Sequence, residues 1–109
     1  SGRVVVNENS YSASLIVTPD RIIADWAPQT FAALAVPHFQ VLAELGVEVV
    51  LIGTGARLRF PPAELLRPLI AAGAGFEVMD TGAACRTYNI LMGEGRKVAA
   101  ALLMIEAET

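Results

Sequence analysis

A glycine-rich turn, Gly53-Thr54-Gly55, directly follows the strongly apolar segment at residues 47–52. Because glycine has no side chain, the backbone N–H groups of such a turn can approach an anionic or carbonyl group closely. The turn lacks the third glycine of a dinucleotide-binding fingerprint and the lysine of a phosphate-binding loop, which disfavours nucleotide binding through either motif. Two interpretations remain: a ligand-binding turn, or a tight structural turn packed under a neighbouring loop.

A second polar motif begins at Thr81, which we expect to be the N-cap of a helix that ends at about Met92. Helical spacing would place Thr81, Cys85 and Asn89 on one stripe. Arg86 would lie beside this stripe, where it could hold a carboxylate or phosphate through two hydrogen bonds. The start of a helix also favours anions, while Asn89 can hydrogen-bond a neutral group or hold a loop.

The same residues also have a purely structural interpretation. In that case Cys85 packs as a small core residue, and Asn89 caps a buried turn. Arg86 would then pair with an acidic side chain such as Asp80. Thiol catalysis by Cys85 is disfavoured, because it needs a base and the only histidine, His38, is far away in the sequence. The sequence therefore predicts no catalytic residue, and one cysteine with one histidine predicts no metal site.

Both polar motifs directly follow apolar segments, at residues 47–52 and 76–79, that have the composition of strands. In open α/β sheets, ligands gather outside the carboxyl ends of the strands. We therefore predict that the turn and the helix start form one polar site, with Arg86 as its principal cationic group. The predicted ligand-binding residues are Gly53, Thr54, Gly55, Thr81, Arg86 and Asn89.

Short strands are predicted at the beginning of the chain. Residues 4–6 and 13–17 are apolar segments separated by the turn-prone residues 7–10, and residues 21–23 follow as a third strand. The pattern predicts an antiparallel β-meander.

Two helices are predicted before the helix at Thr81. Pro37 suits the first position of a short helix that Gly46 ends and whose core side chains are Phe39, Leu42 and Leu45. Pro61 opens the next helix, which Pro68 should kink. Its apolar face contains Leu65, Leu66, Leu69 and Ile70, and it ends at Gly73.

Strands and helices alternate in the second half of the chain, where a final strand is expected at residues 97–105. Such alternation implies right-handed crossovers between strands. The apolar segment at residues 47–52 should be a central strand that is covered on both faces. We predict a single α/β domain over residues 1–109, with three layers, a central mixed sheet and the amino-terminal β-meander.

The composition excludes several classes of protein. Of the 109 residues, 54% are hydrophobic and 17% are charged, far from the composition of a disordered chain. The longest apolar run, residues 98–105, is much shorter than the roughly 20 residues that a membrane-spanning helix needs. A net charge of −3 supplies no basic field for nucleic acid. A single cysteine is typical of a reducing compartment, so we expect the cytoplasm, and Ser1-Gly2 resembles a cleavage scar left by protein expression.

Several short motifs form a specific set: residues 51–55, Phe60-Pro61, residues 79–81, residues 83–91 and Gly95-Arg96. With this set the chain resembles the Mth-type domain family of unknown function, most strongly over residues 47–102. That family includes the mitochondrial complex I assembly factor 3 and the adipogenesis-associated Mth-domain protein. The resemblance implies a three-layer α/β fold, no required cofactor, nucleotide or metal, and protein partners such as subunits of a membrane complex.

Two functions of different classes follow from these observations. The first is a non-enzymatic assembly or protein-interaction module resembling complex I assembly factor 3, cytoplasmic or, in a eukaryote, mitochondrial. The second is a small-molecule or anion-binding protein or enzyme with a pocket between Gly53-Thr54-Gly55 and residues 81–86. An exposed apolar patch would favour the first function, and a concave pocket would favour the second. We favour the first.

Overall fold

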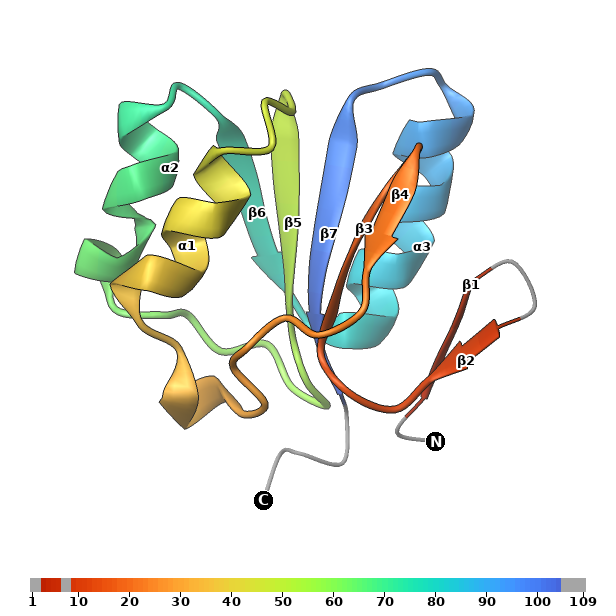
Figure 1. Ribbon diagram of the computed structural model, residues 1–109, viewed down its shortest axis with the longest axis horizontal. Helices are drawn as coiled ribbons and strands as arrows, with labels where there is room; N and C mark the ends of the chain where they lie inside the picture. The colour runs from red at the N-terminus through yellow and green to blue at the C-terminus, as the bar shows by residue number, and fades with distance from the viewer. Residues whose placement is uncertain (1–2, 7–8, 105–109) are drawn as a thin grey trace.

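The computed structural model describes residues 3–6 and 9–104 of the chain. Its main feature is a five-stranded mixed sheet with the strand order β4-β3-β7-β5-β6 (Figure 1). Strands β5, β6 and β7 are parallel, and β3 and β4 add antiparallel pairs at one side. The strands are β3 Leu15–Thr18, β4 Arg21–Ile23, β5 Val49–Thr54, β6 Gly75–Met79 and β7 Val98–Leu103.

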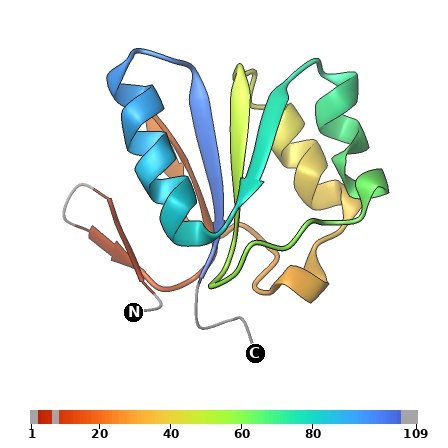
Figure 2. The ribbon, with the colours of Figure 1, turned by 180° about the vertical axis from the view of Figure 1, so that it is seen from behind.

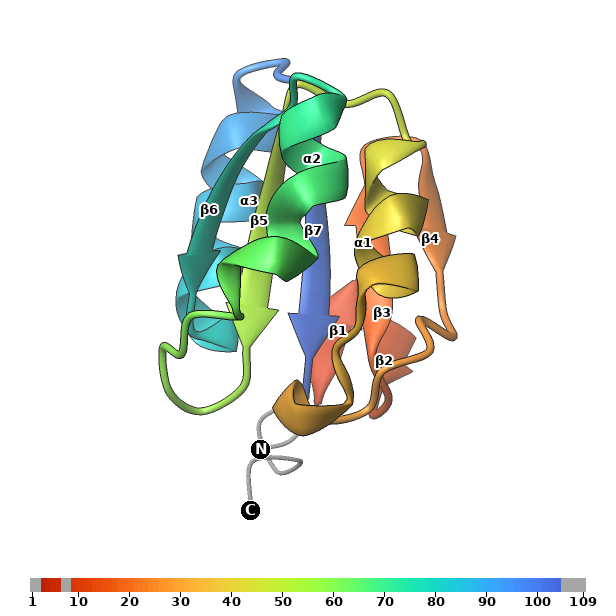
Figure 3. The same cartoon turned by 90° about the vertical axis from the view of Figure 1, so that its left-hand side faces the viewer.

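Helices cover both faces of this sheet. Helices α1, Val36–Ala43, and α2, Arg67–Ala71, lie on one face, and α3, Thr81–Gly93, lies on the other (Figures 2 and 3). The predicted α/β fold class, with three layers around a mixed sheet, is confirmed. Among residues 3–6 and 9–104, none of the helices has the length and hydropathy that crossing a bilayer requires.

The amino-terminal strands form two separate hairpins and not one three-stranded meander. Strand β1, Val4–Val6, pairs with β2, Asn9–Tyr11, in a two-stranded sheet of its own. Strand β3 has β4 on one side and β7 on the other, so no position beside it is left for β1. Asn9 and Ser10, which were expected in a turn, are strand residues because their partner strand decides their conformation. The expected turn residues 7 and 8 lie outside the described part of the chain.

Strand β7 forms the centre of the sheet, and all six of its residues are buried. Ala99, Ala101 and Leu103 face the layer of α1 and α2, while Ala100 and Leu102 face α3. The predicted strand at residues 47–52 is β5, which starts two residues later and has a neighbour on each side. Because successive side chains of a strand point to opposite faces of the sheet, the apolar core is divided into two clusters, one on each face.

Helix α1 begins one residue before Pro37, and the proline therefore occupies an early position where its missing N–H costs nothing. Phe39 and Leu42 are buried, as predicted, and Leu45 packs against the same cluster. His38 accepts a hydrogen bond from the Ala35 N–H at its Nδ1 atom, at 3.0 Å. The only histidine of the chain thus caps a helix.

The predicted kinked helix after Pro61 is wrong in its details. A 3-10 helix, Ala63–Leu66, is followed by the short α-helix α2, in which Pro68 is the second residue and causes no internal kink. Leu69 is fully buried, but Ile70 is 62% exposed. Because α2 has only five residues, its buried face is shorter than that of the longer helix expected from the pattern.

Candidate functional site

The two polar motifs meet at the carboxyl ends of the parallel strands (Figure 3). Thr81, the first residue of α3, donates its backbone N–H to the Gly55 carbonyl at 2.9 Å. Its Oγ1 accepts the Gly55 N–H at 2.9 Å and donates to the Leu103 carbonyl at 2.6 Å. One buried threonine therefore joins the end of β5, the start of α3 and the end of β7.

Thr54 has a similar part on the other side of the turn. Its Oγ1 donates to the Arg57 carbonyl at 2.6 Å and accepts the Arg59 N–H at 3.1 Å. The same oxygen lies 3.2 Å from the Met79 carbonyl at the end of β6. Thr54 is 1% exposed, and its hydroxyl determines the path of the loop that follows β5.

The structure explains why both positions 53 and 55 of the turn are glycine. A Cβ atom on Gly53 would lie 3.0 Å from the Cα and Oγ1 atoms of Thr81 and from the Cδ2 atom of Leu102. Gly55 has a φ of 100°, a backbone angle that residues with a Cβ atom rarely adopt. We call Gly53, Thr54, Gly55 and Thr81 the β5–α3 junction. Its hydroxyl groups bind other parts of the chain, and ligand binding by these residues stays a prediction.

We expected Thr81 to be the N-cap of α3, but the N-cap is Asp80. The Asp80 carboxylate accepts the Ala83 N–H at 2.8 Å, close to the positive end of the helix dipole. Thr81 could not perform this task, because its hydroxyl is engaged by Gly55 and Leu103. The preceding aspartate is an equally good N-cap in sequence terms, and only the tertiary contacts of Thr81 decide between them.

The remaining predicted site residues lie apart from the junction. Arg86 is exposed, and its Nη1 atom lies 3.4 Å from the position that a Cβ on Gly82 would occupy. Asn89, two turns further along α3 than Thr81, lines a separate cavity together with Cys85. The structure thus brings four of the six predicted residues together and places Arg86 and Asn89 elsewhere on the helix.

Burial raises the pKa of the Cys85 thiol above its ordinary value of 9.0, and the nearby Arg86 charge opposes this effect to a smaller extent. The thiol form is therefore favoured at neutral pH. A nucleophilic or metal-binding cysteine needs the thiolate. Among residues 3–6 and 9–104, no three His, Cys, Asp or Glu side chains are grouped to hold a metal ion.

Sequence reasoning missed the loop at residues 56–62. Phe60 is 72% exposed and Leu58 is 50% exposed, while Pro61, near the end of this loop, is buried. The Arg59 guanidinium lies 4.3 Å from the centre of the Phe31 ring, a cation–π contact that attaches the loop to the segment before α1. No helical or strand periodicity assigns this aromatic residue, between an arginine and two prolines, to the core or to the surface, so the sequence does not indicate its exposure.

The sequence matches the family described as protein of unknown function (DUF498/DUF598) over residues 1–103. The chain belongs to the DUF498/DUF598 family. A crystal structure from Bordetella parapertussis resembles this domain with a TM-score of 0.88 and 44% identity, over 94% of this chain and 88% of that chain. A Bordetella pertussis protein described as a Mth938-like domain has a TM-score of 0.85 and 34% identity, over 100% of this chain and 84% of that chain. The resemblance to Mth-type domains is confirmed.

Relatives of this DUF498/DUF598 domain have different names. It is 36% identical over 100 residues to the NADH dehydrogenase [ubiquinone] 1 alpha subcomplex assembly factor 3 of Danio rerio, with 90% of this chain and 57% of that protein covered. It is 27% identical over 103 residues to the 13 kDa major membrane protein of Francisella tularensis, with 94% and 84% covered. The domain spans little more than half the length of the assembly factors.

We predict that Thr81→Val destabilises the DUF498/DUF598 domain by about 2–4 kcal/mol, because two buried backbone groups, of Gly55 and Leu103, lose their partner. Thr81→Ser keeps the hydroxyl and loses one methyl group, so it should cost only about 1 kcal/mol. The free energy of unfolding from urea titrations measures both effects. Equal stabilities of the two variants would contradict the importance of the hydroxyl.

We also predict that the Cys85 thiol reacts slowly with iodoacetamide at pH 7 and that the rate still increases above pH 9, because its pKa is raised. Arg86→Ala removes the opposing charge, so the pKa should rise further and the reaction should be slower at each pH. Mass spectrometry of the alkylated protein gives the rates. A rate that reaches its plateau below pH 8 would show that Cys85 is an activated thiolate.

Proposed function

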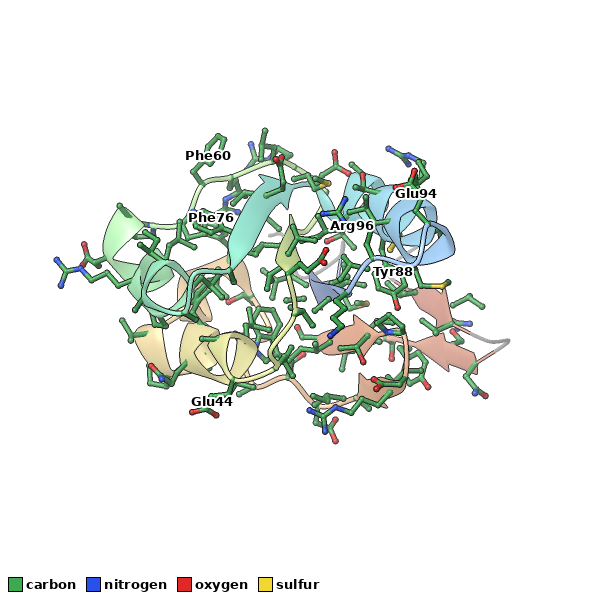
Figure 4. The ribbon with its side chains drawn as sticks, turned by 90° about the horizontal axis from the view of Figure 1, so that it is seen from above. Glu44, Phe60, Phe76, Tyr88, Glu94 and Arg96 are labelled. Carbon is green, nitrogen blue, oxygen red and sulfur yellow. The ribbon has the colours of Figure 1, made fainter. Side chains whose placement is uncertain are left out.

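We propose that this chain is a non-enzymatic assembly or protein-interaction module that contacts its partner with the loop at residues 56–62. The observation that carries the proposal is the exposure of Phe60 and Leu58, 72% and 50%, on one short loop. The Phe60 side chain points away from the body of the domain (Figure 4). Burying a side chain of this kind against a partner contributes about 1.5–3 kcal/mol.

The loop is held in one conformation before any partner binds. Thr54 hydrogen-bonds the backbone of Arg57 and of Arg59, on both sides of Leu58. The Arg59 side chain is attached to the Phe31 ring. A loop that is already ordered loses little conformational entropy on binding, which increases the affinity that two apolar side chains can provide. The rigid β5–α3 junction supports the proposal because it keeps Leu58 and Phe60 in the solvent.

The relatives support an assembly role. Several are named assembly factors of a respiratory complex, so a subunit of a membrane complex is the kind of partner that we propose. Because the domain spans little more than half of those proteins, it would supply one of their binding surfaces. The half-buried free Cys85 is compatible with the reducing cytoplasm as the compartment.

The absence of enzymatic activity is part of the proposal, and the chemistry of the candidate residues supports it. The hydroxyl groups of Thr54 and Thr81 donate to backbone carbonyls and are not available to a substrate. The thiol of Cys85 is favoured over the thiolate. General acid–base or nucleophilic catalysis needs a group in the reactive protonation state within reach of the substrate.

Anion binding at the start of α3 is the second candidate, favoured by the exposed position of Arg86 near Gly82. An anion site there has to act without the amides of Thr81, Ala83 and Ala84, which already donate to protein oxygens.

We expect Arg86→Ala to abolish the chemical-shift changes that inorganic phosphate causes in this region, with no loss of fold. Unchanged phosphate shifts in the variant would remove Arg86 from any such site.

For the interaction surface, we predict that replacing both Leu58 and Phe60 with alanine weakens partner binding by at least tenfold. The matched control is Ile90→Ala, which removes an apolar side chain that is 62% exposed on α3. A photo-crosslinking residue at position 58 or 90 of the native-length protein, followed by mass spectrometry, identifies what each surface contacts in cells. The affinity of the purified partner for each variant is then measured by calorimetry.

Thermal unfolding controls for stability, because exposed residues away from special contacts usually change it little. The proposal requires a partner that crosslinks at position 58, not at position 90, and loses affinity only for the double variant. Equal losses with Ile90→Ala, or a partner that crosslinks only at position 90, would place the interface on another surface.

A further inference from the structure

The two faces of the sheet are covered unequally. Helices α1 and α2 share one face, whereas α3 alone packs over β5, β6 and β7 on the other. The hairpin of β1 and β2 stands beside α3 (Figure 2). A cavity of about 410 Å³ lies between them, lined by β1, the β3–β4 hairpin, α3 and β7. This volume is within the range of about 300–1,000 Å³ that is typical of small-molecule sites.

The cavity is apolar inside and polar at its edge. Ala100 and Leu102 of β7 line it together with Val17 of β3, and all three side chains are buried. Ala100 has the smallest of these side chains, which leaves room above the central strand. Asp20, in the turn between β3 and β4, and Arg21, the first residue of β4, are exposed residues of the lining and carry opposite charges.

Tyr88 of α3 is one of the polar groups that line this cavity, together with Thr18 and Asn89. The residue is 8% exposed and lines the cavity, and its hydroxyl makes no hydrogen bond within residues 3–6 and 9–104, so it is open to the space of the cavity. A tyrosine hydroxyl in this position can donate a hydrogen bond to a ligand in place of water. Figure 4 shows Tyr88 on the side of α3 toward the β3–β4 hairpin. Burial and then the charge of Asp20 raise its pKa, so the hydroxyl is a donor at neutral pH.

We propose that this cavity binds an uncharged, mainly apolar small molecule that accepts a hydrogen bond from the Tyr88 hydroxyl. The apolar lining favours the body of such a molecule, and a carbonyl or ether oxygen would satisfy the unpartnered donor. A charged group is unsuitable, because it would lose hydration inside the cavity, where no lining residue apart from those at the edge is charged. The charges of Asp20 and Arg21 at the edge have opposite signs, so the edge favours neither an anion nor a cation. This site is separate from the β5–α3 junction and from the loop at residues 56–62.

Three probes with the same phenylalkyl body test the proposal: benzylacetone, with a ketone, hydrocinnamate, with a carboxylate, and phenylpropylamine, with an ammonium group. Each is titrated into the ¹⁵N-labelled chain, and the amide shifts are followed by NMR. Benzylacetone should bind with a dissociation constant on the order of 1 mM, as expected for so small a ligand. Its largest shifts should be at Cys85, Tyr88 and Ala100, with small shifts at Leu58 and Phe60. The two charged probes should bind at least about tenfold more weakly.

Two variants identify the groups responsible. Tyr88→Phe removes only the hydroxyl and should weaken benzylacetone about fivefold, which is the effect of one neutral hydrogen bond. Ala100→Leu fills the cavity and should abolish binding. Circular dichroism and thermal unfolding show whether each variant is folded. If Ala100→Leu is unfolded, Tyr88→Phe and the map of shifted amides decide the test.

Several results would overturn the proposal. They are the absence of benzylacetone shifts around the cavity, shifts centred on another surface, and unchanged affinity in Tyr88→Phe. Equal or stronger binding of hydrocinnamate or phenylpropylamine would overturn the assignment to uncharged ligands. Retained affinity in a folded Ala100→Leu variant would show that the cavity is not the site.

Discussion

The arrangement of this domain depends on one buried hydroxyl group. Thr81 Oγ1 accepts a hydrogen bond from the Gly55 amide and donates to the Leu103 carbonyl, so it joins three segments that are distant in the sequence. The contact is close enough to exclude a side chain at Gly53. Since α3 begins at this point, its position on the sheet follows from the same hydrogen bonds.

Because Thr81 is used in this way, residues that are conspicuous in the sequence are not the residues that are available at the surface of the protein. A glycine turn and a polar helix start resemble a ligand site, and here their hydroxyl groups hold the backbone together. In the function that we propose, they act indirectly, through the rigid loop that keeps Phe60 in the solvent. Buried polar groups of this kind specify one conformation, because each alternative conformation would leave a donor or acceptor without a partner.

The unequal covering of the sheet explains where free space remains. The face toward α1 and α2 is closed by two helices and the segment containing Trp26, which is buried in that cluster. The opposite face has one long helix and a small hairpin, and the alanine at position 100 of the central strand leaves volume between them. A domain of 109 residues has few elements with which to cover a five-stranded sheet on both sides. The cavity at Tyr88 is a consequence of this shortage.

Much of the fold follows from local sequence signals. The apolar run of β5 and the alternation of strands and helices after it determine a parallel arrangement, because a right-handed crossover is nearly obligatory between parallel strands. The pairing of β1 could not be predicted in this way, since strand partners are chosen by the space that other strands leave. The distribution of the candidate residues among the junction, the surface and the cavity could not be predicted from local sequence signals either. The sequence by itself determined the order of the principal strands and helices from β3 to β7, but not strand β2 or the type of helix that follows Pro61. Tertiary structure alone decided that Thr81 binds backbone groups, that Asp80 caps α3 and that Phe60 stays exposed, because hydrogen-bond partners and burial depend on segments far apart in the chain.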